Sequence, residues 1–242
     1  KAPGAARRSG AVQRFTVAAD GRMFLVEGKV GSARLKYLCT DGDPRLDCSL
    51  DPNAFAEEIF LATGARGPRG DVIFKDENGD VLLRIMSYGG ATVFWPGKTN
   101  GEAASKTHGD DSALNLPPAS RQDAARRAEL AARTLGGLMG ESIEFNIGTF
   151  RPASASETET SADAAVLADA VVRAAAGMAE VARDQTGARV LRERIVQVKF
   201  TAGGAPKLSL DGKSLIVTYN PSADVAGRPS SRAVREFLEN SL

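Results

Sequence analysis

The chain of 242 residues balances 31 Lys and Arg against 30 Asp and Glu, which gives a formal net charge of +1. Because neither half carries a marked excess of charge, this balance argues against a protein that binds nucleic acid by neutralising many phosphates. The hydrophobic (43%) and charged (25%) fractions are those of ordinary globular domains, which argues against collagen-like and wholly disordered classes. No apolar run approaches the roughly 20 residues of a membrane-spanning helix, so we do not expect a transmembrane protein.

Residues 11–97 predict a series of short antiparallel strands. Apolar and polar residues alternate around Phe15 and from Ala33 to Cys39, as in half-buried strands. Further strands are predicted at 24–26, 57–63, 71–75, 81–86 and 92–95, with turn residues between them. The segment at 57–63 begins with two glutamates that are also typical of a helix start, but its short length favours a strand. Six or seven such strands would form a small barrel or a sandwich.

The composition changes at residues 98–118, which contain Gly, Ser, Thr, Asn, Asp and Pro but few large apolar groups. Such a segment is typical of a linker or a long surface loop. Beyond it, apolar residues recur with the period of a helix. We therefore predict an antiparallel β domain at 11–97, a linker at 98–118 and an α+β domain at 119–242.

About three helices are predicted in the second domain. Ser120 and Asp123 have the spacing of a capping box, and the helix that they open is expected to end at Gly140. The last helix is expected to begin around Pro229, a residue suited to a first helical turn. Helix ends are thus marked by local residue types alone.

The middle helix is expected to begin near Thr160 and to be amphipathic. Its apolar stripe includes Leu167 and Met178, and we expect this stripe to face the core. Asp169 and Arg173 are assigned to the opposite, polar face.

Strands alternate with these helices at 143–147, 195–200, 208–210 and 215–219. Asp211 and Gly212 form a hairpin signal between the last two strands. The order of elements favours an antiparallel sheet with helices on one face. The predicted fold class is therefore α+β, with an N-terminal barrel or sandwich and a C-terminal sheet with helices.

Cys39 and Cys48 flank a turn-rich segment that would bring them within bonding distance. We predict a disulfide, the alternative being two buried free thiols. A disulfide points to an oxidising compartment, and the residues after Lys1 resemble a mature terminus left when a signal peptide is cleaved. Both features favour a periplasmic or secreted protein.

Common catalytic patterns are missing from the sequence. His108 is the only histidine and lies in the predicted linker, so a Ser-His-Asp triad or a two-histidine zinc site lacks a member. The glycines around Arg66 precede a strand, whereas phosphate-binding loops precede a helix. We therefore predict no metal, no cofactor and no nucleotide, and the absences favour a non-catalytic protein.

Five residues are candidates for binding a ligand or an anion. Two arginines lie in a loop with three glycines and Pro68, and guanidinium groups presented by a rigid turn can receive a carboxylate or phosphate. Aromatic residues near the end of the strand series can stack on sugar rings or peptides, or can belong to the core. The candidates are Arg66, Arg69, Arg84, Tyr88 and Trp95.

Three segments carry a resemblance to a known family. Gly67–Asp76, Val81–Ile85 and Gly89–Phe94 resemble the N-terminal region of an uncharacterised family of exported alphaproteobacterial proteins, a domain of unknown function, and Gly227–Ser231 is compatible with it. The similarity is clearest over 65–97. It implies export from a Gram-negative bacterium and implies no activity.

The leading hypothesis is a non-catalytic periplasmic or envelope-associated protein, monomeric or weakly oligomeric, that binds an envelope protein or a small ligand. One alternative is a hydrolase or transferase that acts on an envelope glycan through two carboxyls from different strands. The adjacent pairs Glu57–Glu58 and Asp110–Asp111 do not suit this role, because neighbouring side chains on a strand point to opposite faces and the second pair lies in the predicted linker. Another alternative is a lipid-binding β domain. These hypotheses predict different sites: a surface, a cleft with two carboxyls, or an apolar cavity.

Overall fold

The structure, a computed structural model, describes residues 11–43, 45–49, 57–67, 69–148 and 158–242. The chain divides into two compact units, and the α+β prediction is confirmed. Unit 1 comprises Lys1–Thr40 and Ile59–Leu114, whereas unit 2 comprises Asp41–Glu58 and Asn115–Leu242. The second unit thus takes one segment from within the sequence of the first.

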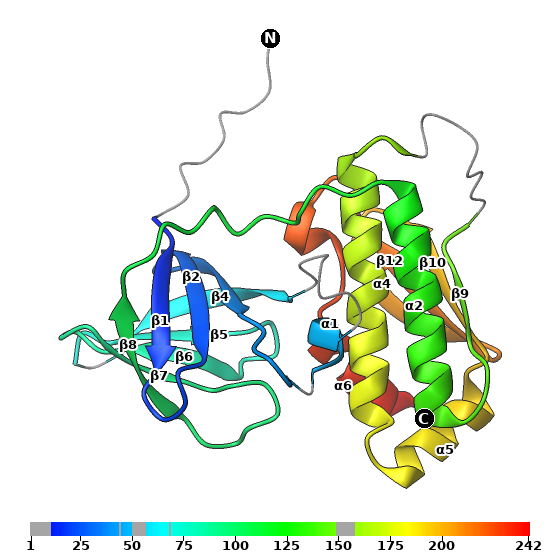
Figure 1. Cartoon of the computed structure of the whole chain (residues 1–242), viewed down its shortest axis with the longest axis horizontal. Coiled ribbons are helices and arrows are strands. Elements are labelled where there is room, and N and C mark those ends of the chain that lie inside the picture. The colour runs from blue at the N-terminus through cyan, green and yellow to red at the C-terminus, as the bar shows by residue number, and fades with distance from the viewer. Residues whose placement is uncertain (1–10, 44, 50–56, 68, 149–157) are drawn as a thin grey trace. The chain divides into compact units, whose positions relative to one another are not determined.

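Unit 1 is a closed barrel of eight antiparallel strands (Figure 1). The pairing of β1 with β8, which aligns Arg14 with Thr107, closes the barrel. A closed barrel leaves no strand edge exposed. Its strands are β1 (Gln13–Val17), β2 (Met23–Lys29), β3 (Ser32–Tyr37), β4 (Ile59–Arg66), β5 (Val72–Lys75), β6 (Val81–Ile85), β7 (Gly90–Val93) and β8 (Glu102–Thr107).

Strand β8 lies in the segment predicted to be a linker at 98–118. The strand is composed of small and polar residues, and Ala104 is its one buried residue. Its position in the barrel comes from backbone pairing with β1 and β7, which sequence hydrophobicity does not report. The barrel unit therefore extends to Leu114.

Aromatic side chains fill the core of the barrel. Phe15 and Phe24 stack with ring centroids 5.1 Å apart. Tyr37 contacts Trp95 edge-on at 4.9 Å, and its hydroxyl donates to the carbonyl of Phe94 at 3.0 Å. These rings occupy the space that a lipid would need inside such a barrel.

Unit 2 contains a mixed sheet in the order β11-β12-β10-β9. Only β11 and β12 are antiparallel; β12 and β9 both run parallel to β10. The prediction of an antiparallel sheet was wrong for β9 and β10, because β12 rather than β11 lies next to β10. The strands are β9 (Glu144–Asn146), β10 (Gln197–Ala202), β11 (Lys207–Asp211) and β12 (Ser214–Tyr219).

Helices α2 and α4 lie side by side against one face of this sheet (Figure 1). Helix α4 is buried almost all round, from Ala164 to Ala179. Ser120 and Asp123 form the predicted capping box of α2, and Gly140 ends that helix with φ of 72°. The helices are α1 (Leu46–Ser49), α2 (Arg121–Met139), α4 (Ala162–Val181), α5 (Gln185–Arg194) and α6 (Ser231–Ser241), with a 3-10 turn η1 (Asp224–Gly227).

Helix α5 was not predicted from the sequence, because Leu191 is its one buried residue and gives no apolar stripe. The helices predicted to begin near Thr160 and Pro229 have Ser161 and Ser230 as their N-caps, each one residue after the predicted start. Among the described helices, none combines the length and the apolarity that a membrane crossing requires.

The predicted disulfide between Cys39 and Cys48 is present. Cys48 lies in α1, at the start of the segment that unit 2 takes from between β3 and β4. The bond closes a short loop, which reduces the conformational freedom of the unfolded chain.

Candidate functional site

The predicted arginines of unit 1 do not share one environment. Arg84 is paired with Asp71 through two nitrogen atoms, with Nε 2.9 Å from Oδ2. This hydrogen bond lowers the pKa of Asp71, and the charge of Arg69 lowers it further. Arg66 and Arg69 have exposed side chains, whereas Pro68 lies outside the described residues.

The two aromatic candidates, Tyr88 and Trp95, differ in how far their side chains are exposed. Tyr88 is 82% exposed in the turn between β6 and β7, whereas Trp95 is 5% exposed. Arg22 lies over the Trp95 ring, 4.3 Å from its centroid, so this ring belongs to the barrel core and its rim. Tyr88 follows Ser87, whose backbone N–H donates to Asp71 at 3.4 Å. The turn carrying Tyr88 therefore lies beside the arginine loop.

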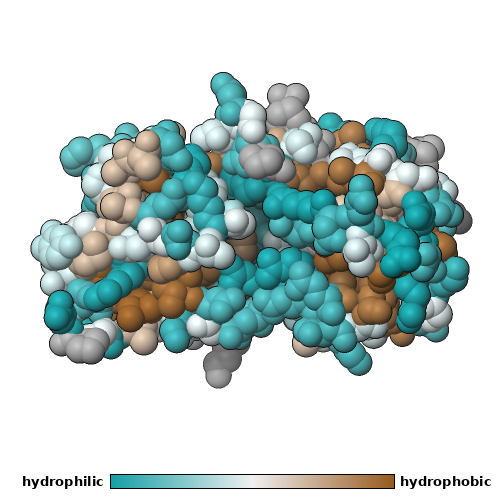
Figure 2. Space-filling view, turned by 90° about the horizontal axis from the view of Figure 1, so that it is seen from below, coloured by the Kyte–Doolittle hydropathy of each residue, from teal (hydrophilic) through white to brown (hydrophobic). Residues whose placement is uncertain are grey.

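Exposed apolar residues are dispersed over the described chain. In the face shown in Figure 2, hydrophilic residues cover much of the surface and hydrophobic ones form separate patches. The large apolar residues with exposed side chains come from five different places in the sequence: Val30, Leu61, Tyr88, Leu138 and Val196. Scattered residues of this kind are normal for a globular surface and do not by themselves mark a binding site.

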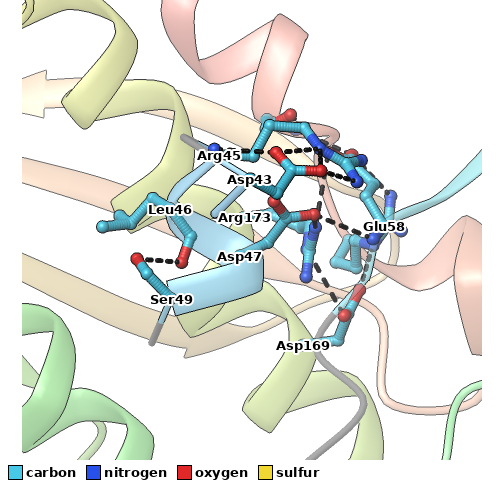
Figure 3. A network of polar contacts seen from close by, with 10 residues as sticks. Asp43, Arg45, Leu46, Asp47, Ser49, Glu58, Asp169 and Arg173 are labelled. Carbon is cyan, nitrogen blue, oxygen red and sulfur yellow. Dashed lines mark hydrogen bonds and ion pairs between the residues drawn. The ribbon is translucent and has the colours of Figure 1, made fainter. Parts of the chain in front are cut away.

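Unit 2 contains a buried network of ion pairs (Figure 3). Three parts of the chain contribute to it: the segment 41–58, helix α4, and the start of α6 with the residues before it. Asp169 and Arg173 are therefore buried in this network, and the prediction that they lie on a polar outer face of the helix was wrong. Other parts of unit 2 cover α4 on more than one side. The principal charged members are Asp47, Glu58, Asp169, Arg173 and Arg228.

Arg173 is the centre of the network and its side chain is 0% exposed. One Nη atom lies 3.3 Å from Asp47 and 3.4 Å from Glu58, and Nε lies 3.3 Å from Asp169. Arg228 approaches Asp169 at 2.5 Å. Each guanidinium group therefore neutralises carboxylates from segments distant in the sequence.

Backbone groups complete the network around Glu58. Its carboxylate accepts from the N–H of Ser231 at 2.9 Å and also from the hydroxyl of Ser231. The N–H of Glu58 donates to Asp47 at 3.1 Å. Asp43 and Arg45 form a local pair beside these groups, with 2.8 Å between Nη2 and Oδ2 (Figure 3). The network thus ties the segment 41–58 to the first turn of α6.

The arginines of the network favour the ionised form of Asp169. Burial acts to raise the pKa of Asp169, but the charges of Arg173 and Arg228 outweigh burial and lower it. Burial likewise opposes the charge of Arg173, while Asp169 and Glu58 raise its pKa. A carboxylate that is buried and bound by arginine is not placed to take up a proton from a substrate. We therefore assign the network a structural role.

A groove of about 390 Å³ lies at the N-terminal end of α4 in unit 2. Its volume is within the range of small-molecule sites. Its lining contains both apolar side chains and polar ones, and the polar ones carry three hydroxyls and one carboxylate. The lining residues are Leu116, Pro118, Thr160, Ser161, Ala162, Ala165, Val166, Ser222 and Asp224.

The polar part of the groove is positioned by helix and turn geometry. Ser161 caps α4, and its hydroxyl accepts from the N–H of Ala164 at 3.1 Å. Asp224 accepts from the N–H of Leu116 at 3.1 Å, which connects η1 to the chain entering α2. Asp224 also has a φ of 48°, a backbone conformation uncommon for residues other than glycine. The groove lining therefore combines hydroxyls, a carboxylate and apolar side chains.

None of the groove residues was among the predicted binding residues. The lining of the groove combines residues 116–118, 160–166 and 222–224, which are brought together only by folding. The cap residues before α4 and the turn-rich Asn220–Asp224 stretch were visible as signals of local structure. Neither signal indicates a cavity. No cluster of three or more His, Cys, Asp or Glu in the described ranges is arranged to hold a metal ion.

Comparison with known proteins identifies a family. The family model described as Domain of unknown function (DUF4908) matches residues 2–238, which is nearly the whole chain. No curated protein and no solved structure matches the chain.

Proposed function

The chain belongs to the DUF4908 family, whose description states no activity, and we propose that it is a non-catalytic binding protein of the bacterial envelope, periplasmic or secreted. The groove at the start of α4 is the proposed ligand site. A space of about 390 Å³ lined by both apolar and polar side chains is the observation that carries this proposal. The disulfide between Cys39 and Cys48 supports the location, because such bonds persist in oxidising compartments.

The lining indicates the chemistry of the ligand. An apolar portion would pack against Leu116, Pro118 and Val166, and a hydrogen-bonding portion would reach the hydroxyls or Asp224. A small amphipathic metabolite meets both requirements, whereas a whole lipid with two acyl chains and a headgroup is larger than the space. The protein would therefore bind a compact ligand rather than a whole lipid.

The two alternative functions find less support. A hydrolase or transferase of the predicted kind needs two carboxyls in one cleft, and Asp224 is the one carboxylate among the described lining residues. The buried carboxylates around Arg173 are occupied by arginines. A lipid-binding barrel would need to displace the rings packed around Tyr37.

The proposal is tested by native mass spectrometry of freshly purified protein and by a thermal-shift screen with amino acids, short peptides, monosaccharides and short fatty acids. We expect at least one compound to stabilise the protein; saturation at 100 times Kd corresponds to about 2.7 kcal/mol. Ser222 is exposed and lines the groove, so Ser222→Trp should fill the space and weaken binding at least tenfold.

Ser112→Trp is the matched control, since Ser112 is also an exposed serine but does not line the groove. This variant should bind the same compound with unchanged affinity. The proposal is contradicted if no compound in the screen binds, or if both variants bind the compound equally well.

A further inference from the structure

Strand β11 is an edge of the mixed sheet in unit 2. It pairs with β12 along its whole length, from Lys207 opposite Thr218 to Asp211 opposite Ser214. Among the described strands, β11 has no second neighbour. The outer edge of β11 therefore carries backbone N–H and carbonyl groups that can pair with another strand.

The two faces of β11 have different chemistry. Leu208 and Leu210 point to the helix side, where their strand partners Val217 and Leu215 are buried. They are themselves only partly buried. Lys207, Ser209 and Asp211 share the opposite face, because side chains alternate along a strand.

The sequence Lys207–Asp211 is complementary to itself when it is read in the opposite direction. In an antiparallel pair centred on Ser209, Lys207 lies opposite the partner's Asp211, and Leu208 lies opposite the partner's Leu210. By symmetry each pair occurs twice. Moving the centre to Leu208 or Leu210 would lose both charge pairs, so the charges select one register.

We propose that β11 pairs with β11 of a second copy of this chain, so that two four-stranded sheets join into one continuous sheet. Lys207 and Asp211, at the two ends of β11, disfavour a partner strand that lacks opposite charges at the matching positions. A second copy of β11 supplies both of these opposite charges. The open edge and the self-complementary charges both point to this partner. This inference does not depend on the proposed ligand.

The contact is short, and its length sets the expected strength. Five residues of strand extend about 17 Å at roughly 3.4 Å per residue, which is less than the span of a standard stable interface. We therefore expect a weak dimer, with a dissociation constant in the micromolar range or above, that forms as the protein concentration rises.

Sedimentation velocity over a concentration series of the full chain tests the proposal. Lys207→Glu and Asp211→Lys each replace two attractive charge pairs by two repulsive ones. The dissociation constant of the dimer should therefore rise by about tenfold or more in each variant. The double variant K207E/D211K restores opposite charges across the two-fold axis and should dimerise like the original chain. A general loss of folding would not be reversed by the second substitution.

Cross-linking provides an independent readout of the register. Ser209 lies on the proposed two-fold axis, so Ser209→Cys should give a disulfide-linked dimer on mild oxidation, because the native cysteines are already paired. The exposed Ser112→Cys is the control and should remain largely monomeric. A chain that stays monomeric at all concentrations, or single and double charge variants that behave alike, would overturn the proposal.

Discussion

Arg173 shows how strongly one residue can depend on distant parts of the chain. Its guanidinium group has no exposed surface and lies within 3.4 Å of carboxylates from the segment 41–58 and from α4. Moving a charged group out of water costs free energy, and this cost is offset only when its ionic and hydrogen-bonding partners are in place. Removing one member of the network should therefore be far more costly than removing a surface ion pair.

Arg173→Met should lower the free energy of unfolding by about 3–5 kcal/mol, because Asp47, Glu58 and Asp169 lose a buried positive charge. Equilibrium urea denaturation measures this change. Arg173→Lys keeps the charge with fewer hydrogen bonds and should lose less stability. Arg133→Met is the control, since Arg133 is exposed on α2 and lies 4.0 Å from Glu129.

The control substitution should leave stability within about 0.5 kcal/mol of the original chain. Equal effects of Arg173→Met and Arg133→Met would contradict the structural role assigned to the network.

At the scale of elements, α4 and α6 approach closely at Gly177. A Cβ atom at this position would lie 2.5 Å from the backbone oxygen of Ser231 and 2.7 Å from Cβ of Val234. Backbone cannot move aside as a flexible side chain can, so the absence of a side chain at Gly177 permits the helix contact. Gly137 in α2, in contrast, has no neighbouring atom within 4 Å of a Cβ position.

Gly177→Ala and Gly137→Ala should therefore change stability in opposite directions. The first should destabilise the chain by about 1–3 kcal/mol through overpacking, and the second should stabilise it by about 0.5–1 kcal/mol through helix propensity. Urea midpoints of the two variants, measured side by side, test this. Stabilisation by both substitutions would show that helix propensity, not packing, decides at Gly177.

At the scale of the whole molecule, the two compact units are not two consecutive stretches of the sequence. Segment 41–58 lies between two barrel strands but belongs to unit 2, where it supplies Asp47 and Glu58 to Arg173. The neighbouring strands β3 and β4 pair directly, with Lys36 opposite Ile59. The barrel can thus be closed without segment 41–58, but the network cannot be completed without it.

A fragment of residues 115–242 should therefore fail to unfold cooperatively, because Arg173 lacks two of its partners. Tethering residues 41–58, with Cys48→Ser, to its N-terminus through a flexible linker should restore a cooperative transition. The barrel fragment, 11–40 joined to 59–114 by a short Gly-Ser linker and carrying Cys39→Ser, should fold alone. Circular dichroism during thermal unfolding measures all three. Cooperative unfolding of 115–242 by itself would contradict the prediction.

Local patterns accounted for much of the fold. The capping box of Ser120 and Asp123, the Gly140 helix end and the turn at Gly212 need only neighbouring residues, and each is present as predicted. The candidate binding residues Arg66, Arg69, Arg84 and Tyr88 remain predictions, whereas Trp95 is buried in the barrel. The groove residue Asp224 was not a candidate, because its neighbour Leu116 is 108 positions away.

The sequence by itself determined the α+β class, the barrel-forming strands up to β7, the principal helix ends and the disulfide, because periodicity, capping and turn chemistry act over a few residues. Only the tertiary structure decided that β8 closes the barrel, that β10 has two parallel neighbours, and that Arg173 is buried among carboxylates. The same holds for the groove. Each of these features depends on which distant segments lie side by side, and neither charge balance nor hydrophobic period contains that information.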